Sequence, residues 1–184
     1  DITLNGYVEY WNKKEIIIPD FQRSYVWDRI KASKLIESFL LGLPVPGTFL
    51  YKQKSKAGFL IIDGQQRITS VVRYIKGTFD ETIFRLKNVS SRFEGKSFSD
   101  LDEDDQFKLK GAVLRATIIQ QINPLDDTSI YQIFERLNTG GVNLNPMEVR
   151  QCVSYGPFVR ALKQMNEDLN WRKIIGKDKI DKRL

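Results

Sequence analysis

The stretch Phe59-Leu-Ile-Ile-Asp-Gly-Gln-Gln-Arg-Ile-Thr-Ser (residues 59–70) decides how this chain is expected to fold. Its first four residues are apolar and fit a buried strand, and the polar residues 63–67 fit a turn. After the turn, four aliphatic residues recur at the spacing of one helix face: Ile68, Val71, Val72 and Ile75. The stretch therefore predicts a strand that runs directly into a helix, and this helix is expected to end at Gly77.

The segments on either side predict further elements of an α+β domain. Residues 48–51 fit a strand that pairs with residues 59–62 as a hairpin. Residues 15–18 fit a strand that stops at Pro19, and residues 113–119 fit a later strand. These strands and helices, with no internal repeat, low-complexity segment or linker in the chain, predict one domain of the α+β class.

Capping signals mark two more helices in the first two thirds of the chain. Asp28 is placed to cap a helix that Gly42 ends. The apolar face of this helix is predicted to consist of Ile36, Phe39, Leu40 and Leu43. Ser99 with Asp102 resembles a capping box, and the acidic residues 102–105 favour the positive end of a helix dipole.

The last third of the chain is predicted to be helical. One helix is expected from Asp127 to the break at Gly140-Gly141, and Asn145 is placed to cap the next. A basic helical stretch leads toward Trp171. We therefore expect a single domain over residues 1–184, with a sheet-containing core over 1–122 and a helical part over 123–184.

Length and chain ends suggest the setting in which this domain works. With 184 residues the chain is long enough for one domain and too short for two ordinary ones. It opens without Met and stops in charged residues, so we expect a piece of a longer cytoplasmic protein. No apolar run approaches the roughly 20 residues of a membrane helix, so no membrane partner is expected.

Composition excludes several classes of chemistry within this chain. Zero histidines and one cysteine exclude His-based metal sites, Ser-His-Asp triads and a disulfide framework, and we expect no zinc, haem or flavin. The net charge of +6 suits a polyanionic partner such as a nucleotide or nucleic acid. The P-loop and dinucleotide fingerprints are absent from the sequence, so nucleotide binding would need a different architecture.

Residues 63–67 have the layout of a phosphate site. Amides at a helix N-terminus carry partial positive charge, and Gly64 lets the backbone approach an anion closely. Arg67 adds a bidentate donor, and Asp63 could hold that arginine or a magnesium ion. The alternative is that Asp63 only caps the helix while Arg67 only makes a surface ion pair.

Two other stretches carry polar residues suited to the same ligand. Gln22 and Arg23 lie in a loop beside aromatic residues, which can stack on a base. Residues 134–141 end a predicted helix in two glycines and could form a backbone nest for a second phosphate, with Arg136, Asn138 and Thr139 beside it. The alternative is that Gly140 and Gly141 only stop the helix.

Taken together, four motifs resemble one family in order and spacing. They are Ile18-Pro-Asp-Phe-Gln-Arg-Ser-Tyr-Val-Trp, Leu43-Pro-Val-Pro, Ile62-Asp-Gly-Gln-Gln-Arg-Ile-Thr and Ile133-Phe-Glu-Arg-Leu-Asn-Thr-Gly-Gly. The family is the N-terminal domain of GmrSD-type modification-dependent restriction proteins, which is related to the ParB and sulfiredoxin nucleotide-binding fold. The likeness covers nearly the whole chain.

The resemblance implies a small ParB-like mixed sheet flanked by helices that binds a nucleoside triphosphate with Mg²⁺. The residues it implies for catalysis are Asp63, Gln65, Gln66 and Arg67, with Asp63 as the metal ligand. Those it implies for nucleotide binding are Gln22, Arg23, Asp63, Gly64, Arg67, Thr69, Arg136, Asn138, Thr139, Gly140 and Gly141. In several members, hydrolysis of GTP or another nucleoside triphosphate is coupled to the control of DNA cleavage in phage defence.

The expected function is therefore that of a regulatory domain that binds a nucleoside triphosphate. The sequence is compatible both with hydrolysis of this nucleotide and with binding alone. DNA would be engaged indirectly or through a C-terminal nuclease domain, whose His-containing motif this histidine-free chain lacks. A homodimer is compatible with the same reading. The alternative from another class is a non-catalytic module that binds DNA or senses modified DNA, and a third is a protein-interaction scaffold.

Overall fold

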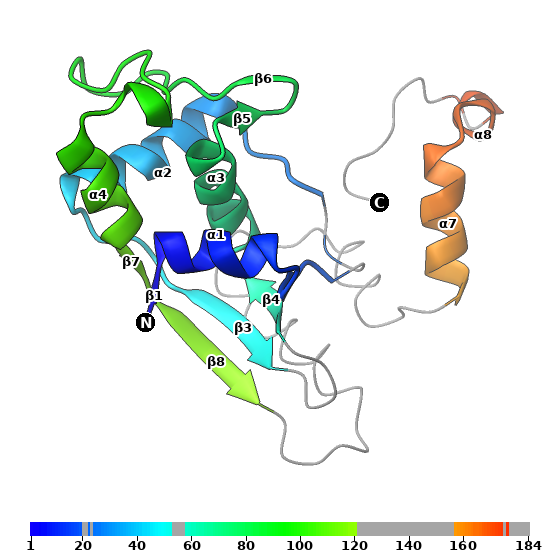
Figure 1. Ribbon diagram of the computed structural model, residues 1–184. Helices are drawn as coiled ribbons and strands as arrows, with labels where there is room; N and C mark the ends of the chain where they lie inside the picture. Colours follow the sequence, from blue (N-terminus) through cyan, green and yellow to red (C-terminus); the bar gives the residue numbers. More distant parts are fainter. Residues whose placement is uncertain (20–21, 23, 53–57, 121–156, 175, 177–184) are drawn as a thin grey trace. The chain divides into compact units, whose positions relative to one another are not determined.

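The computed structural model (Figure 1) describes residues 1–19, 22, 24–52, 58–120, 157–174 and 176. The chain divides into two compact units, of which the first comprises Asp1–Ile18 and Trp27–Ile122. The second unit comprises Pro19–Val26 and Asn123–Leu184. A single domain over residues 1–184 stays a prediction, and each unit is described by itself.

A four-stranded mixed sheet forms the centre of the first unit, with the strand order β2-β4-β3-β8. The strands are β2 (Ile16–Ile17), β3 (Thr48–Lys52), β4 (Phe59–Asp63) and β8 (Ala116–Gln120). The predicted hairpin is confirmed, because β3 and β4 pair antiparallel. The outer pairs β2·β4 and β3·β8 are parallel. This mixed sheet with its helices confirms the α+β class, while the ParB-like topology stays a prediction.

The single strand predicted over residues 113–119 is wrong in extent. It is divided into β7 (Val113–Leu114), which pairs antiparallel with β1 (Ile2–Thr3), and β8, which pairs with β3. Arg115 lies between them, and its carbonyl oxygen accepts hydrogen bonds from the backbone nitrogen of Thr48 at 2.8 Å and from its Oγ1 at 3.2 Å. The break falls at Arg115 because the residues before it pair with β1 and those after it pair with β3, which belongs to a different sheet.

Three helices supply most of the apolar core of the first unit. They are α1 (Leu4–Asn12), α2 (Arg29–Leu41) and α3 (Gln65–Ile75), and α3 contacts both of the others. Figure 1 shows α3 emerging from the end of β4. The fully buried residues they contribute include Leu4, Tyr7, Ile36, Leu40, Ile68 and Val71. On the sheet, Leu50 and Ile61 lie opposite each other and are also fully buried.

The caps predicted for α2 are confirmed. The Asp28 side chain accepts from the backbone nitrogen of Lys31 at 2.7 Å, and Gly42 ends the helix with a φ of 71°. Leu43 is half-exposed rather than part of the apolar face, because the helix stops at Leu41 and the left-handed Gly42 redirects the chain. Helix α1 was not predicted from the sequence, although Thr3 caps it by accepting from the backbone nitrogen of Gly6.

The rest of the first unit consists of short elements. They are the hairpin β5 (Thr78–Phe79) and β6 (Thr82–Ile83), the 3-10 turn η1 (Phe98–Asp100) and α4 (Glu103–Gly111). The capping box predicted for Ser99 and Asp102 is wrong by two residues, since Ser97 and Asp100 form it. Asp102 instead caps α4 alone, accepting from the backbone nitrogen of Asp105 at 2.8 Å. The acidic first turn of α4 is confirmed.

Two helices are described in the second unit, α7 (Pro157–Glu167) and α8 (Leu169–Ile174). Asp168 separates them and accepts from the backbone nitrogens of Asn170 and Trp171. The helices predicted from Asp127 and Asn145 lie outside the described residues. Within the described ranges, no helix has the length and apolarity that crossing a membrane requires.

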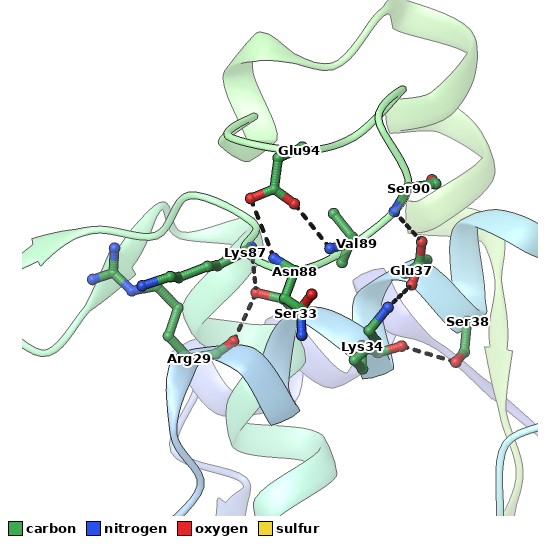
Figure 2. Close-up of polar contacts among 10 residues, drawn as sticks. All are labelled: Arg29, Ser33, Lys34, Glu37, Ser38, Lys87, Asn88, Val89, Ser90 and Glu94. Carbon is green, nitrogen blue, oxygen red and sulfur yellow. Dashed lines mark hydrogen bonds and ion pairs between the residues drawn. The ribbon is translucent and has the colours of Figure 1, made fainter.

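A loop after β6 is held by side-chain oxygens that accept from four consecutive backbone N–H groups, as Figure 2 shows. The four donors belong to residues 87–90. Ser33 accepts the first, and the Glu94 carboxylate accepts the second and third at 3.2 and 2.9 Å. Glu37 accepts the fourth, from Ser90, at 2.6 Å. Helix α2 thus fastens the loop through Ser33 and Glu37.

The attachment of Ser90 to Glu37 predicts a component of stability that depends on pH. Burial acts to raise the pKa of Glu37, but hydrogen bonds from Ser90 and Lys34 outweigh it and hold that pKa below its ordinary value of 4.5. The stabilisation is therefore complete above pH 4.5 and lost as the pH falls through the lowered pKa. We expect Glu37→Gln to reduce the loss of unfolding free energy between pH 7 and pH 3, measured by urea unfolding.

The exposed Glu81 supplies the matched control for this measurement. Glu81→Gln should leave the pH dependence of the unfolding free energy close to that of the unchanged protein. Equal pH dependence in Glu37→Gln and the unchanged protein would contradict the role of the Glu37 carboxylate.

Candidate functional site

The predicted strand–turn–helix layout is confirmed at residues 63–67, which we name the DGQQR turn. Asp63 is the last residue of β4, Gly64 is the N-cap of α3, and Gln65 is the first helical residue. Gly64 has no side chain that could cap the helix, and the positive end of the α3 dipole begins one residue after Asp63. This arrangement places an arginine, a carboxylate and a helix N-terminus within five residues.

Gly64 is required by the strand next to it. Its φ is 97°, a backbone conformation that residues other than glycine rarely adopt. A Cβ added at this position would lie 2.4 Å from Cγ2 of Thr48. The sequence interpretation assigned this glycine to the approach of an anion. The structure gives a second reason that needs no ligand, namely the contact between the turn and β3.

Arg67 is bound to two acceptors through one nitrogen. Its Nη2 donates to Oδ2 of Asp63 at 2.6 Å and to the carbonyl oxygen of Gly47 at 2.9 Å. The prediction that Asp63 holds Arg67 is confirmed. The alternative of a helix-capping Asp63 is wrong, because Gly64 occupies the N-cap position. The Arg67 side chain is only 18% exposed, so this is no freely solvated surface pair.

Two buried polar atoms of α3 have no hydrogen-bond partner among the described residues. They are Nε of Arg67 and Oγ1 of Thr69, a residue that is 5% exposed. Buried donors in native proteins are nearly always hydrogen-bonded, so each of these atoms calls for an acceptor. In Arg67, Nε belongs to the same guanidinium as Nη2, which already donates to the Asp63 carboxylate. A guanidinium has five N–H donors and can therefore bind several anionic oxygens at once.

The two glutamines of the DGQQR turn are both buried. Gln65 is 7% exposed and Gln66 is 8% exposed. Oε1 of Gln66 accepts a hydrogen bond from the backbone nitrogen of Trp27 at 3.1 Å. The Gln66 side chain therefore connects the first turn of α3 to the residue that precedes the N-cap of α2.

Tyr7 is a neighbour of the turn that the sequence interpretation missed. Its hydroxyl lies 2.9 Å from Oγ1 of Thr48 and donates to the carbonyl oxygen of Leu114 at 3.3 Å. Burial raises the pKa of Tyr7, while the hydrogen bond with Thr48 and the charge of Arg67 act in the opposite direction. Tyr7 thus stays a neutral phenol near Arg67, and Thr48 connects it to Gly64.

The predicted pocket, shared by the three motifs, involves residues of both units and residues outside the described ranges. Gln22 is buried and belongs to the second unit, where its backbone nitrogen donates to the carbonyl oxygen of Pro19 at 2.9 Å. The other predicted binding residues, Arg23, Arg136, Asn138, Thr139, Gly140 and Gly141, lie outside the described residues. Whether they join the DGQQR turn stays a prediction.

Asp63 fits a magnesium ion only as one contributor. Its carboxylate is half-exposed, and one oxygen is already bound to Arg67. In the described part of the chain, no group of three or more Cys, Asp or Glu residues is placed to hold a metal ion. This donor set suits Mg²⁺, which is commonly bound by one or two carboxylates together with substrate phosphates.

The fold and the turn define an α+β protein with an arginine-bearing helix N-terminus at the end of a sheet strand. Residues 8–154, well over half of the chain, match the family model described as "GmrSD restriction endonuclease, N-terminal domain". The chain belongs to this family, and its role accordingly lies in restriction. No curated protein and no solved structure matches the chain.

The contact between Gly64 and Thr48 predicts a coupled pair of substitutions. Gly64→Ala should lower the free energy of unfolding by at least about 2 kcal/mol, because backbone strain and the clash with Thr48 add. Thr48→Ser removes Cγ2 and keeps the hydroxyl that Tyr7 contacts. Thr48→Ser alone should lower the free energy of unfolding by about 1 kcal/mol.

In the double variant, the missing methyl group gives the new Cβ part of the space it needs. The combined loss should therefore be smaller than the sum of the single losses by about 0.5 kcal/mol or more, measured by urea unfolding. Full additivity would show that the clash with Thr48 is not what excludes a side chain at position 64.

Proposed function

We propose that this chain is a regulatory domain of a restriction system that binds a nucleoside triphosphate, with the phosphates at the DGQQR turn. The observation that carries the proposal is Arg67, a largely buried cation whose Nε has no partner among the described residues while its Nη2 is held by Asp63 and Gly47. The turn adds the positive end of the α3 dipole, which favours an anion at the same place.

Charge and chemistry both support a phosphate ligand. The whole chain carries a net charge of +6, which raises the local concentration of polyanions. Phosphoryl transfer depends mainly on positioning and electrostatic stabilisation, so a site without histidine can carry it out. In the proposed site Arg67 balances the phosphate charge, and a glutamine of the turn orients the attacking water.

Magnesium enters this proposal through Asp63. A bound Mg²⁺ would neutralise part of the phosphate charge, which otherwise faces the Asp63 carboxylate. Asp63 would then have two roles, holding Arg67 in place and contributing one oxygen to the ion. DNA cleavage would belong to a nuclease domain outside this chain, which nucleotide binding would control.

The first test is a calorimetric titration of ATP, GTP, CTP and UTP with Mg²⁺ into the folded protein. We expect at least one nucleotide to bind and Arg67→Ala to weaken it by tenfold or more, because a charge-assisted contact to phosphate is lost. The matched control is Arg73→Ala, since Arg73 lies near the other end of α3 and pairs with Asp80 at 2.9 Å.

Two results would overturn this proposal. Unchanged affinity in Arg67→Ala would remove the DGQQR turn from the binding site. Failure of all four nucleotides to bind the folded protein would favour the DNA-binding alternative, whose affinity should fall steeply as the salt concentration rises.

A second test separates the two roles of Asp63. Asp63→Asn keeps an oxygen that can accept from Arg67 but removes the negative charge that attracts Mg²⁺. We expect the gain in nucleotide affinity on adding Mg²⁺ to shrink by tenfold or more, measured by titrations with and without the ion. A full Mg²⁺ effect in Asp63→Asn would show that Asp63 serves Arg67 alone.

A further inference from the structure

Trp27 marks the place where the chain enters the first unit after residues 19–26, which belong to the second unit. It directly precedes Asp28, the N-cap of α2. Its indole lies under the ammonium group of Lys31, with Nζ 5.0 Å from the ring centroid. Trp27 therefore lies at the junction between residues 19–26 and the start of α2.

The backbone of Trp27 is held by one side chain of the DGQQR turn. Its nitrogen donates to Oε1 of Gln66 over 3.1 Å. Gln66 is 8% exposed, and the backbone carbonyl of the same residue accepts from Oγ of Ser70 at 2.7 Å inside α3. Loss of the Gln66 side-chain oxygen would therefore remove this acceptor from the Trp27 amide. Because Gln66 is buried, we expect this loss to be costly.

We propose that Gln66 is a positioning residue that couples the nucleotide site to the entrance of α2, and that its carboxamide does not act on the nucleotide. The coupling rests on the proposed function, because the ligand would bind at Arg67, the next residue in the same helical turn. A ligand that orders this turn favours the state in which Gln66 holds Trp27. By linkage, the Trp27 amide then opens less often when the site is filled.

The chemistry of the contact distinguishes this role from a catalytic one. Trp27 uses Gln66 as an acceptor, so any side chain of the same length with an oxygen at that position should preserve the contact. A glutamine that orients water must instead present both its donor and its acceptor correctly. Gln66→Glu keeps the acceptor and loses the donor.

The test is amide hydrogen exchange of the whole folded chain, resolved at Trp27 by NMR, with and without the nucleotide that binds best. In Gln66→Leu and Gln66→Asn, which remove or shorten the acceptor, the Trp27 amide should exchange about tenfold faster. In Gln66→Glu the amide should remain protected. The matched control Gln65→Leu changes the neighbouring buried glutamine and should leave Trp27 protected.

The nucleotide adds a readout that a purely structural contact would not change. In the unchanged protein, saturating nucleotide should slow exchange at Trp27 by threefold or more, and this effect should vanish in Gln66→Leu. If the nucleotide slows exchange equally in both proteins, the coupling through Gln66 is wrong.

The two proposals can fail separately. If no nucleotide binds, the proposed function and the coupling fail, while exchange without ligand still decides whether Gln66 holds Trp27. If Trp27 stays protected in both Gln66→Leu and Gln66→Asn, or if Gln65→Leu exposes it equally, Gln66 is not the positioning residue.

Discussion

The contact of Gly64 with Thr48 is the constraint on which the rest of the site depends. Since no Cβ intervenes, α3 begins directly against β3, and its first turn lies beside the loop that leads into that strand. Arg67 can then reach the carbonyl oxygen of Gly47 while it binds Asp63. Thr48 in turn bonds to Tyr7 of α1 and to the carbonyl of Arg115, so one strand residue brings three distant segments together.

The sequence predicted the elements whose signals are local. The β3–β4 hairpin, the caps of α2 and the buried face of α3 all follow from the spacing of residues close together in the chain. The division of residues 113–119 could not be predicted this way, because it depends on pairing with β1 and β3, two strands that lie far away in the chain and belong to different sheets. The capping box was misplaced because two Ser-x-x-Asp patterns overlap, and only packing selects Ser97 with Asp100.

The candidate site shows the same division between local and long-range information. The pair Asp63–Arg67 is separated by one helical turn, so its spacing alone predicted it. Tyr7 and Gly47 were missed because their contacts with the turn cross the fold. Helix α1 carried a readable signal, a Thr3 cap followed by Leu4, Tyr7 and Val8 at helical spacing, and that signal would have directed attention to Tyr7.

In the proposed site, the Arg67 guanidinium would be shared between the Asp63 carboxylate and a phosphate. Asp63 orders the guanidinium and neutralises it, so a phosphate bound as proposed would gain a positioned donor but also meet a carboxylate. In the proposed function a divalent cation resolves this conflict, because it converts Asp63 from a repelling group into a ligand. An arginine without such a partner would attract many anions, whereas under the proposed function this pair would favour an anion that arrives with its own cation. Selectivity for a magnesium-bound triphosphate over a bare phosphate would then follow from the same ion pair that holds Arg67 in place.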